Sequence, residues 1–283
     1  MSTSTKYIFK AKTKQASVIK ILGELLNNTI KFAPFCINEK GIFLTQQDAK
    51  NEQLIDIALY KENFSSYKCE KQLKFIVNSQ HLYRMLKSIK KKDGIILFIT
   101  EEDEYMLGFS IEQSEENNKI TKYIRTSEAR IDIIQKPEGY ENPIITTSKE
   151  FQRMKTLHNF SKLMVVTSQP EYIKFFCDAG DLYKQELEFG TKPEEDDKVF
   201  KTYKQHFNTL HITGLVRCAN QSNTIHIFVH EDLGMKVKMK AGDLGDITVY
   251  IKSKEIIEDE KDEETINKED HEDLEEDEIE FES

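Results

Sequence analysis

Hydrophobic residues in the first 254 positions recur mostly with the period of a β-strand. Short segments are continuously apolar or alternate with polar residues, and turn signals such as Asn38-Glu39-Lys40-Gly41 and Lys92-Asp93-Gly94 separate them. The pattern predicts strands over residues 41–47, 52–60, 73–78, 94–100, 104–111, 163–168, 172–179, 224–230, 235–241 and 246–251. Strands therefore dominate the predicted fold.

Helical periodicity appears in four places. Residues 15–26 and 81–92 each carry an apolar stripe at intervals of three and four residues, with basic residues off that stripe. A third helix is predicted to begin at Thr147, which has the spacing of a capping box with Glu150. A fourth, over residues 208–218, is weaker because Gly214 interrupts it.

The order of these elements suggests an internal repeat. Strands and helices alternate similarly in residues 1–120 and 145–254, so we expect two similar domains. Residues 121–144 have only a weak hydrophobic pattern, so we interpret them as a connector on the surface. The connector also carries apolar residues, which must pack on a neighbouring sheet or be covered by a partner.

Charge divides the chain differently. The formal net charge is -10, but residues 255–283 hold 17 Asp and Glu against only Lys261 and Lys268. Residues 1–254 therefore hold 33 acidic and 38 basic residues, which makes this body mildly basic at about +5. The acidic tail is too poor in apolar residues to fold alone, and we expect it to be disordered.

The sequence offers no convincing catalytic site. It lacks the Gly-rich phosphate loops, the GxSxG elbow and the HExxH helix, and we expect no enzyme activity and no cofactor. His226 and His230 share one face of a predicted strand near Glu231 and Asp232, but no third ligand cluster is evident, so we expect no metal.

Cysteine usage and hydropathy indicate the compartment. Four widely spaced cysteines are interpreted as reduced core thiols: Cys36, Cys69, Cys177 and Cys218. No run of about 18 apolar residues exists, and the N-terminus lacks the apolar core of a secretion signal. We therefore expect a soluble intracellular protein with no membrane partner.

Three stretches, taken in order, resemble a known family. They are residues 41–87 (GIFLTQQDAK to HLYRMLK), SKEFQRM at 148–154 and MKAGDLGDITVYI at 239–251. Together they are similar to DNA sliding clamps of the proliferating-cell-nuclear-antigen type, which occur in eukaryotes, archaea and large DNA viruses. The resemblance covers nearly all of residues 7–254. It implies an α+β fold with two similar clamp domains per subunit, antiparallel sheets outside and short helices inside, assembled as a homotrimeric ring around DNA.

The resemblance also implies three sets of site residues. DNA contacts are expected from basic residues on the inner helices: Lys14, Lys20, Arg84, Lys87, Lys91, Lys149, Arg153 and Arg217. A partner pocket between the connector and the last strand is expected to use Gln47, Leu54, Ile131, Ile133, Ile134, Pro137, Leu233, Tyr250, Ile251 and Lys252. Subunits are expected to pair edge strands through Tyr123 and Ile124 of one and Ile173, Phe175 and Cys177 of the next.

These sites imply partners and a function. The family holds duplex DNA without reading its sequence, and binds DNA polymerase, the clamp loader and other proteins that carry a clamp-binding motif. We therefore expect a DNA polymerase processivity factor in the nucleus or in a viral replication compartment. The pocket departs from the family pattern at Gln47, where relatives have a thioether or aliphatic side chain, at Asn51, where a His is common, and at Lys252-Ser253, where a small residue and proline are common. The more polar floor is expected to weaken the usual motif or to prefer a variant one.

Other interpretations remain open on the residues alone. The basic residues would also suit ordinary solvated helix faces, and Leu54 and Tyr250 would suit a core. The rival function is a clamp-fold interaction protein that forms no homo-ring, either a subunit of a hetero-clamp or a monomeric DNA-binding processivity factor. A more remote one is an acidic-tailed chaperone of basic proteins. The tail itself is interpreted as discouraging DNA contact outside the ring, as binding basic partners, or as aiding solubility.

Overall fold

The computed structural model describes residues 6–115, 118–129, 134–158, 160–191 and 202–262. Within these residues the strands form three antiparallel sheets. The first sheet has five strands in the order β5 (Ser66–Cys69), β1 (Tyr7–Thr13), β7 (Gly94–Thr100), β8 (Met106–Gln113) and β9 (Asn118–Arg125). Strand β9 includes the start of the predicted connector, which is therefore part of a sheet up to Arg125.

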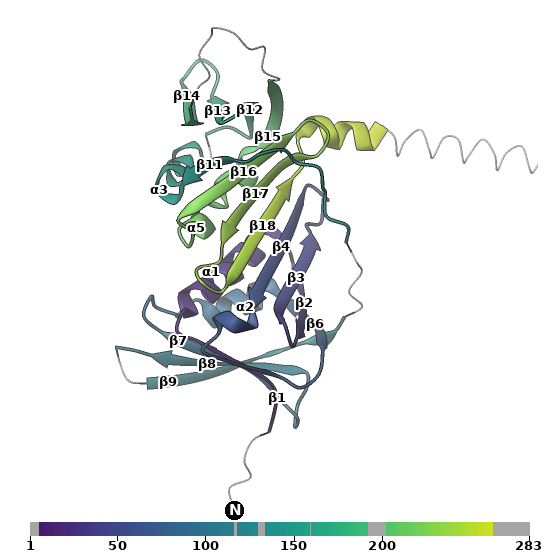
Figure 1. The fold of residues 1–283 in the computed structure, drawn as a ribbon, viewed down its shortest axis with the longest axis vertical. Helices are drawn as coiled ribbons and strands as arrows, with labels where there is room; N and C mark the ends of the chain where they lie inside the picture. Colours follow the sequence, from purple (N-terminus) through teal and green to yellow (C-terminus); the bar gives the residue numbers. More distant parts are fainter. Residues whose placement is uncertain (1–5, 116–117, 130–133, 159, 192–201, 263–283) are drawn as a thin grey trace, which may run out of the picture.

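The second sheet joins the two halves of the chain. Its nine strands run in the order β10 (Ser127–Glu128), β6 (Leu73–Asn78), β2 (Phe32–Asn38), β3 (Gly41–Gln47), β4 (Gln53–Tyr60), β18 (Gly245–Ile251), β17 (Gly234–Lys240), β16 (Thr224–His230) and β11 (Ile144–Thr147). The two halves meet where β4 pairs with β18, from Gly245 opposite Leu59 to Ile251 opposite Gln53. Figure 1 shows this sheet running continuously through the centre of the molecule.

The third sheet lies at the end of the second half. Its four strands run in the order β14 (Lys184–Gly190), β13 (Tyr172–Asp178), β12 (Leu163–Gln169) and β15 (Tyr203–Asn208). All ten strands predicted from the hydrophobic pattern are present across the three sheets. The pattern missed mainly edge or partly exposed strands such as β5, β10 and β14, in which few residues are buried.

Short helices cover one side of the sheets. They are α1 (Ala16–Thr29), α2 (Ser79–Leu86), α3 (Ser148–Phe151) with its 3-10 continuation η2 (Gln152–Leu157), α4 (Thr209–Thr213) and α5 (Val216–Ala219); η1 (Lys61–Asn63) is a single 3-10 turn. The predicted capping box is confirmed, because Thr147 and Glu150 bond each other's backbone N–H. The fourth predicted helix is divided into α4 and α5 around Gly214.

The predicted boundaries of two helices were displaced: the second was expected to extend to residue 92, and the first, expected over 15–26, covers 16–29. Helix α2 ends at Leu86, so Lys91 lies in the turn that follows it rather than on its basic face. Lys14 likewise lies in the bend before α1. The N-terminal boundary of α2 is fixed by Asn78, whose side-chain oxygen accepts a hydrogen bond from the N–H of His81.

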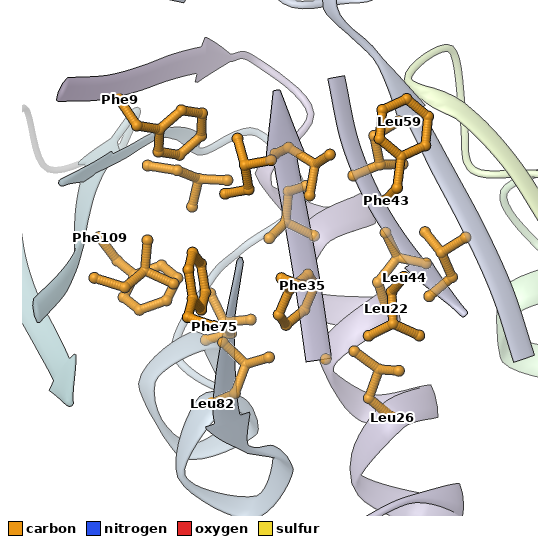
Figure 2. A pocket seen from close by; sticks show the side chains of 18 residues that line it. Phe9, Leu22, Leu26, Phe35, Phe43, Leu44, Leu59, Phe75, Leu82 and Phe109 are labelled. Carbon is orange, nitrogen blue, oxygen red and sulfur yellow. The ribbon is translucent and has the colours of Figure 1, made fainter. Parts of the chain in front are cut away.

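The core of the first half lies between its two sheets and helices α1 and α2. Figure 2 shows aromatic and aliphatic side chains, among them Phe9, Phe35, Phe75 and Phe109, converging on a small apolar cavity of about 60 Å³. Helices α1 and α2 approach closely at Gly23, where an added Cβ would stand 2.8 Å from the Leu86 side chain. Both helices therefore pack closely against each other and against the sheets.

The element order of the first half recurs in the second. Residues 7–125 contain one strand, a helix, four strands, a second helix and three strands, with β5 and η1 inserted before the fourth of the four strands. Residues 144–251 repeat this order without the insertion, and their second helix is divided into α4 and α5. Strand β9 therefore has β18 as its counterpart, and β4 has β14. The domain boundaries themselves stay a prediction.

The start of the acidic tail differs from the prediction. Residues 254–262 form a helix, called the C-terminal helix below and drawn in yellow in Figure 1, where disorder was expected from residue 255. Ser253 begins it by accepting hydrogen bonds from the N–H groups of Ile256 and Ile257. Ile256 and Ile257 are half-buried, which gives an otherwise charged segment an apolar side. The rest of the tail, 263–283, lies outside the described residues.

Candidate functional site

The helices form one continuous layer. Helix α2 contacts α1, α1 contacts α5, and α5 contacts α3 and η2. Figure 1 shows α3, α5, α1 and α2 along the same side of the nine-stranded sheet, opposite the connector. Any charge on the outer surface of these helices therefore contributes to a single face of the molecule.

Most of the predicted DNA-contacting residues lie on or beside this face. Arg84 on α2, Lys149 on α3, Arg153 on η2 and Arg217 on α5 have exposed side chains. Lys87 is exposed at the C-terminal cap of α2. Lys14 and Lys91 are exposed in the loops named above. Lys155 on η2 is also exposed and was not predicted.

Two of the predicted basic residues make internal contacts. Lys20 is half-buried, and its ammonium group donates to the Ile89 carbonyl at 2.8 Å, which ties α1 to the end of α2. Arg217 forms an ion pair with Glu24 of α1, and this hydrogen bond raises the pKa of the guanidinium. Because Glu24 compensates part of its charge, Arg217 attracts an external anion less strongly than Arg84 or Arg153 does.

A pocket of about 210 Å³ lies on the other side of the molecule, beside the C-terminal end of β18. It brings together seven of the ten residues predicted for a partner pocket: Gln47, Leu54, Pro137, Leu233, Tyr250, Ile251 and Lys252. Ile134 is half-buried but does not line it, and Ile131 and Ile133 lie outside the described residues. The lining also includes residues that were not predicted: Asn51, Glu52, Gln53, Gln135, Asp232, Ile256 and Glu260.

The turn between β3 and β4 shapes one side of this pocket. Asp48 accepts hydrogen bonds from the N–H groups of Glu52 and Gln53 at 2.8 and 2.9 Å. Asn51 adopts a left-handed conformation with φ of 56°, which asparagine tolerates better than most residues. The turn thereby fixes the backbone at Glu52 and Gln53, both of which line the pocket.

The connector is held across the sheet by Tyr140. Its hydroxyl donates to the Leu233 carbonyl at 2.8 Å, and the Lys236 ammonium group lies 4.3 Å from the centre of its ring. Burial raises the pKa of Tyr140 far above its ordinary value, so the hydroxyl remains a donor. This anchor positions Leu233, a pocket residue, relative to the connector.

The strands predicted to join subunits differ in their exposure. Strand β9 is an edge strand, and Tyr123 is 54% exposed, whereas Ile124 points into the core at 6%. The prediction for the opposite partner was wrong, because β13 is paired on both sides and Ile173, Phe175 and Cys177 are fully buried. The edge strand beside it is β14.

Within the described residues, no three His, Cys, Asp or Glu side chains gather as a metal site. No helix in the same part of the chain is long and apolar enough to cross a membrane. All four cysteines are free; Cys177 and Cys218 are buried as predicted, whereas Cys36 and Cys69 are only half-buried.

These features define an α+β protein with repeated halves, antiparallel sheets and a layer of short helices. Residues 8–134 match the family model described as proliferating cell nuclear antigen, N-terminal domain. The chain is 22% identical over 253 residues to a probable DNA polymerase sliding clamp 1 of Paramecium bursaria Chlorella virus 1, covering 86% of this chain and 96% of that one. The resemblance indicated by the sequence motifs is therefore confirmed.

Two further relatives come from different sources. The proliferating cell nuclear antigen of Chaetomium thermophilum is 23% identical over 256 residues, which covers 87% of this chain and 98% of that protein. A probable DNA polymerase sliding clamp of Autographa californica nuclear polyhedrosis virus is 19% identical over 258 residues, covering 90% and 99%. Eukaryotic and viral clamps thus share similarity with nearly the full described body of this chain.

Proposed function

We propose that this protein is a sliding clamp, a non-catalytic processivity factor that closes into a homotrimeric ring around duplex DNA and tethers DNA polymerase and other replication and repair proteins. The proposal is supported by the names of its relatives and, most directly, by the junction between β4 and β18. In the proposed ring, two subunits pair their edge strands in the same way as β4 and β18 pair within one chain. The site of action is the nucleus, or the replication compartment of a large DNA virus.

The two edge strands that would join subunits are the counterparts of the two that join the halves. Strand β18 reads DITVYI at residues 246–251, and β9 reads KITKYI at residues 119–124. Strand β4, which accepts β18, has β14 as its counterpart. Pairing β9 of one subunit with β14 of the next therefore repeats, between chains, a contact that already exists within the chain. A head-to-tail contact of this kind closes into a ring when the rotation that relates one subunit to the next divides a full turn evenly, as a third of a turn does for three subunits.

The register of the existing junction can be carried over to the contact between subunits. Asp246 pairs with Ala58, and Ile247 with Ile57. The hairpin registers align β4 with β14, because Tyr60 pairs with Gly41 as Gly190 pairs with Tyr172. Ala58 then corresponds to Glu188 and Ile57 to Leu187, which places Lys119 opposite Glu188 and Ile120 opposite Leu187 of the neighbour. The first pair has opposite charges on one face, and the second covers an isoleucine that is 37% exposed in the single chain.

The remaining sheet edges in the described part of the chain are less available. Strands β5, β10 and β11 are only four, two and four residues long. On β15, the side chain of Glu255 accepts a hydrogen bond from the N–H of His206. Strands β9 and β14 are longer and open, and open edges of that length need a partner if they are not to promote aggregation.

The helix layer supports the DNA-binding part of the proposal. Its exposed basic side chains would face the central hole, where they attract phosphates without reading bases. Each attraction is screened beyond a Debye length of about 8 to 10 Å at physiological salt, so the grip is loose and the duplex slides. Enclosure, rather than affinity, then keeps the protein on DNA.

The test compares circular and linear DNA. We expect the loaded protein to remain on a nicked circle in high salt and to be released when the circle is cut, as measured by gel filtration. The double variant Arg84→Ala/Lys87→Ala should remain trimeric but load less efficiently, whereas Lys238→Ala, on the exposed face of β17, should behave as the parent. A parent protein that stays monomeric at micromolar concentration, or leaves circles and linear DNA equally fast, would refute the ring.

A further inference from the structure

The C-terminal helix lies against the pocket beside β18. Ile256 and Glu260 line that pocket together with Leu54, Tyr250 and Lys252. The pocket is still hollow with the helix in place, at about 210 Å³, so the helix forms a wall of the pocket and does not fill it. Its residues come from the segment that the sequence assigned to a disordered tail.

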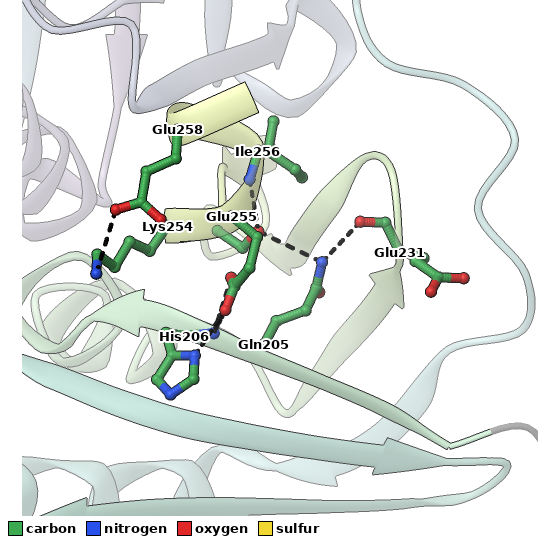
Figure 3. Close-up of polar contacts among 8 residues, drawn as sticks. Gln205, His206, Glu231, Lys254, Glu255, Ile256 and Glu258 are labelled. Carbon is green, nitrogen blue, oxygen red and sulfur yellow. Dashed lines mark hydrogen bonds and ion pairs between the residues drawn. The ribbon is translucent and has the colours of Figure 1, made fainter. Parts of the chain in front are cut away.

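The helix is attached to β15 by specific polar contacts, drawn in Figure 3. The carboxylate of Glu255 accepts from the backbone N–H of His206 at 3.1 Å and lies 2.6 Å from its ring Nδ1. Gln205 donates to the Glu231 carbonyl at 2.7 Å and to the Ser253 hydroxyl at 3.4 Å. These contacts fix the first turn of the helix, and with it the position of Ile256.

The ionisation of Glu255 suits this attachment. Burial acts to raise the pKa of the carboxyl, but hydrogen bonds from His206 and from backbone N–H groups outweigh it, and the pKa is lowered overall. The side chain is therefore ionised at neutral pH and accepts hydrogen bonds as a carboxylate, which strengthens them.

The rim of the pocket is acidic. Glu52, Asp232 and Glu260 line it against the single ammonium group of Lys252, which leaves a formal charge of -2, and the Glu52 carboxylate also lies 3.6 Å from the Nε2 of His211. Lys252 is already engaged with Glu260. The apolar lining suits a segment with apolar anchors, and the surplus negative charge attracts a basic side chain beside them.

We propose that the C-terminal helix forms one wall of the partner pocket and contacts the bound partner segment. Glu255 and His206 hold the helix in place, and the helix selects partner segments in which a basic side chain flanks the apolar anchors. The inference rests on the partner-tethering part of the proposed function. Ile256 supplies apolar contact, Glu260 supplies charge, and Glu255 is a positioning residue that touches no partner.

The experiment measures binding of two synthetic peptides to the full chain by fluorescence anisotropy. Both peptides carry the same aliphatic and aromatic residues on one helical turn, flanked either by two lysines or by two glutamates. We expect the parent to prefer the lysine peptide. Glu260→Gln should weaken the lysine peptide by about two- to fivefold and leave the glutamate peptide equal or tighter, because exposed charge pairs contribute modestly.

Two other variants test the wall itself. Ile256→Ala should weaken both peptides by about fivefold through lost apolar contact. Glu255→Ala should weaken both to a similar degree and also speed hydrogen exchange at the His206 amide, a readout that Ile256→Ala should leave unchanged. Glu255→Gln, which keeps an acceptor oxygen, should recover part of the affinity. The matched control is Glu258→Gln on the same helix, which pairs with Lys254 and does not line the pocket.

Three results would overturn the inference. Tighter binding by Glu255→Ala would mean that the helix competes with partners. Equal affinities for Ile256→Ala, Glu260→Gln and the Glu258→Gln control would mean that the helix takes no part. A parent chain that is retained on circular DNA yet binds neither peptide would refute this inference and still support the ring. A parent chain that selects the lysine peptide but is not retained on circular DNA would refute the ring and still support this inference.

Discussion

At the scale of single residues, Gly245 marks a close approach between the two halves of the chain. It begins β18, and a Cβ added there would stand 1.8 Å from the Ala58 carbonyl oxygen of β4. No movement of a flexible side chain could relieve this contact, because the obstructing atom belongs to the backbone. The position therefore requires glycine for steric reasons, although its backbone conformation does not.

Replacing this glycine tests how firmly the halves are joined. Gly245→Ala is expected to lower the free energy of unfolding by about 2 kcal/mol, since the added methyl forces β18 away from β4. Urea denaturation measures the change. The control is Gly180→Ala: that glycine has φ of 71° but nothing within 4 Å of an added Cβ, so only the conformational cost of about 1 kcal/mol applies. Equal losses would contradict the steric explanation.

The cysteines offer a second test at this scale. Burial raises the pKa of the Cys218 thiol to about 12, and it raises the pKa of Cys177 as well. Burial also raises the pKa of Cys69, so the contrast rests mainly on access: we expect iodoacetamide at pH 8 to modify half-buried Cys36 first and Cys69 more slowly, while buried Cys177 and Cys218 stay protected. Mass spectrometry of the folded chain resolves the four sites. Equal labelling of Cys218 would show that the helix layer opens readily.

At the scale of elements, the short helices depend on their boundaries. Helix α3 spans only four residues before its 3-10 continuation, and such a helix has few backbone hydrogen bonds of its own. The capping box at Thr147 and Glu150 compensates by satisfying free N–H groups at both residues. Lys149 and Arg153 lie on the helical turns that follow this cap.

Removing the cap should therefore affect both stability and the basic face. Thr147→Ala is expected to cost about 1 kcal/mol of unfolding free energy, the usual value for a lost N-cap. Thermal and urea denaturation measure it, with Gln152→Ala, an exposed position on η2, as the control. A variant that is as stable as the parent would mean that packing of Phe151 and Met154 alone holds this segment.

At the scale of the whole molecule, the main feature is a pair of open, complementary edges. Strand β9 carries Lys119 and Arg125 on its outward face, and β14 carries Glu186 and Glu188. Like edges repel, so two β9 strands or two β14 strands have no reason to pair. Unlike edges attract, which favours head-to-tail addition and disfavours a symmetric dimer.

A charge exchange tests the register derived from the internal junction. Lys119→Glu and Glu188→Lys should each weaken self-association by about three- to tenfold, and the double variant, or a mixture of the two single variants, should recover much of it. Analytical ultracentrifugation measures the equilibrium. Lys204→Glu on β15 serves as a control, because that strand faces the C-terminal helix. Failure of the double variant to recover would argue for another register.

Much of the fold could be predicted from the sequence because its signals are local. Alternation of apolar residues with period two located ten strands, and the spacing of Thr147 and Glu150 located a helix start. The division of charge between body and tail is likewise a property of the chain itself. The ordered motifs resembling sliding clamps were also sufficient to indicate seven of the pocket residues before any contact was known.

Only the tertiary structure decided which surfaces are free. The family resemblance suggested a subunit contact at β13, but β13 is an interior strand with a strongly hydrophobic pattern, and the half-polar β14 is the edge. Arg217 meets Glu24 across 193 residues, which no local pattern reveals. The C-terminal helix forms because His206 and the pocket supply contacts that its charged sequence lacks. Local periodicity specifies elements, whereas pairing, edges and pocket walls depend on residues that the chain brings together only when it folds.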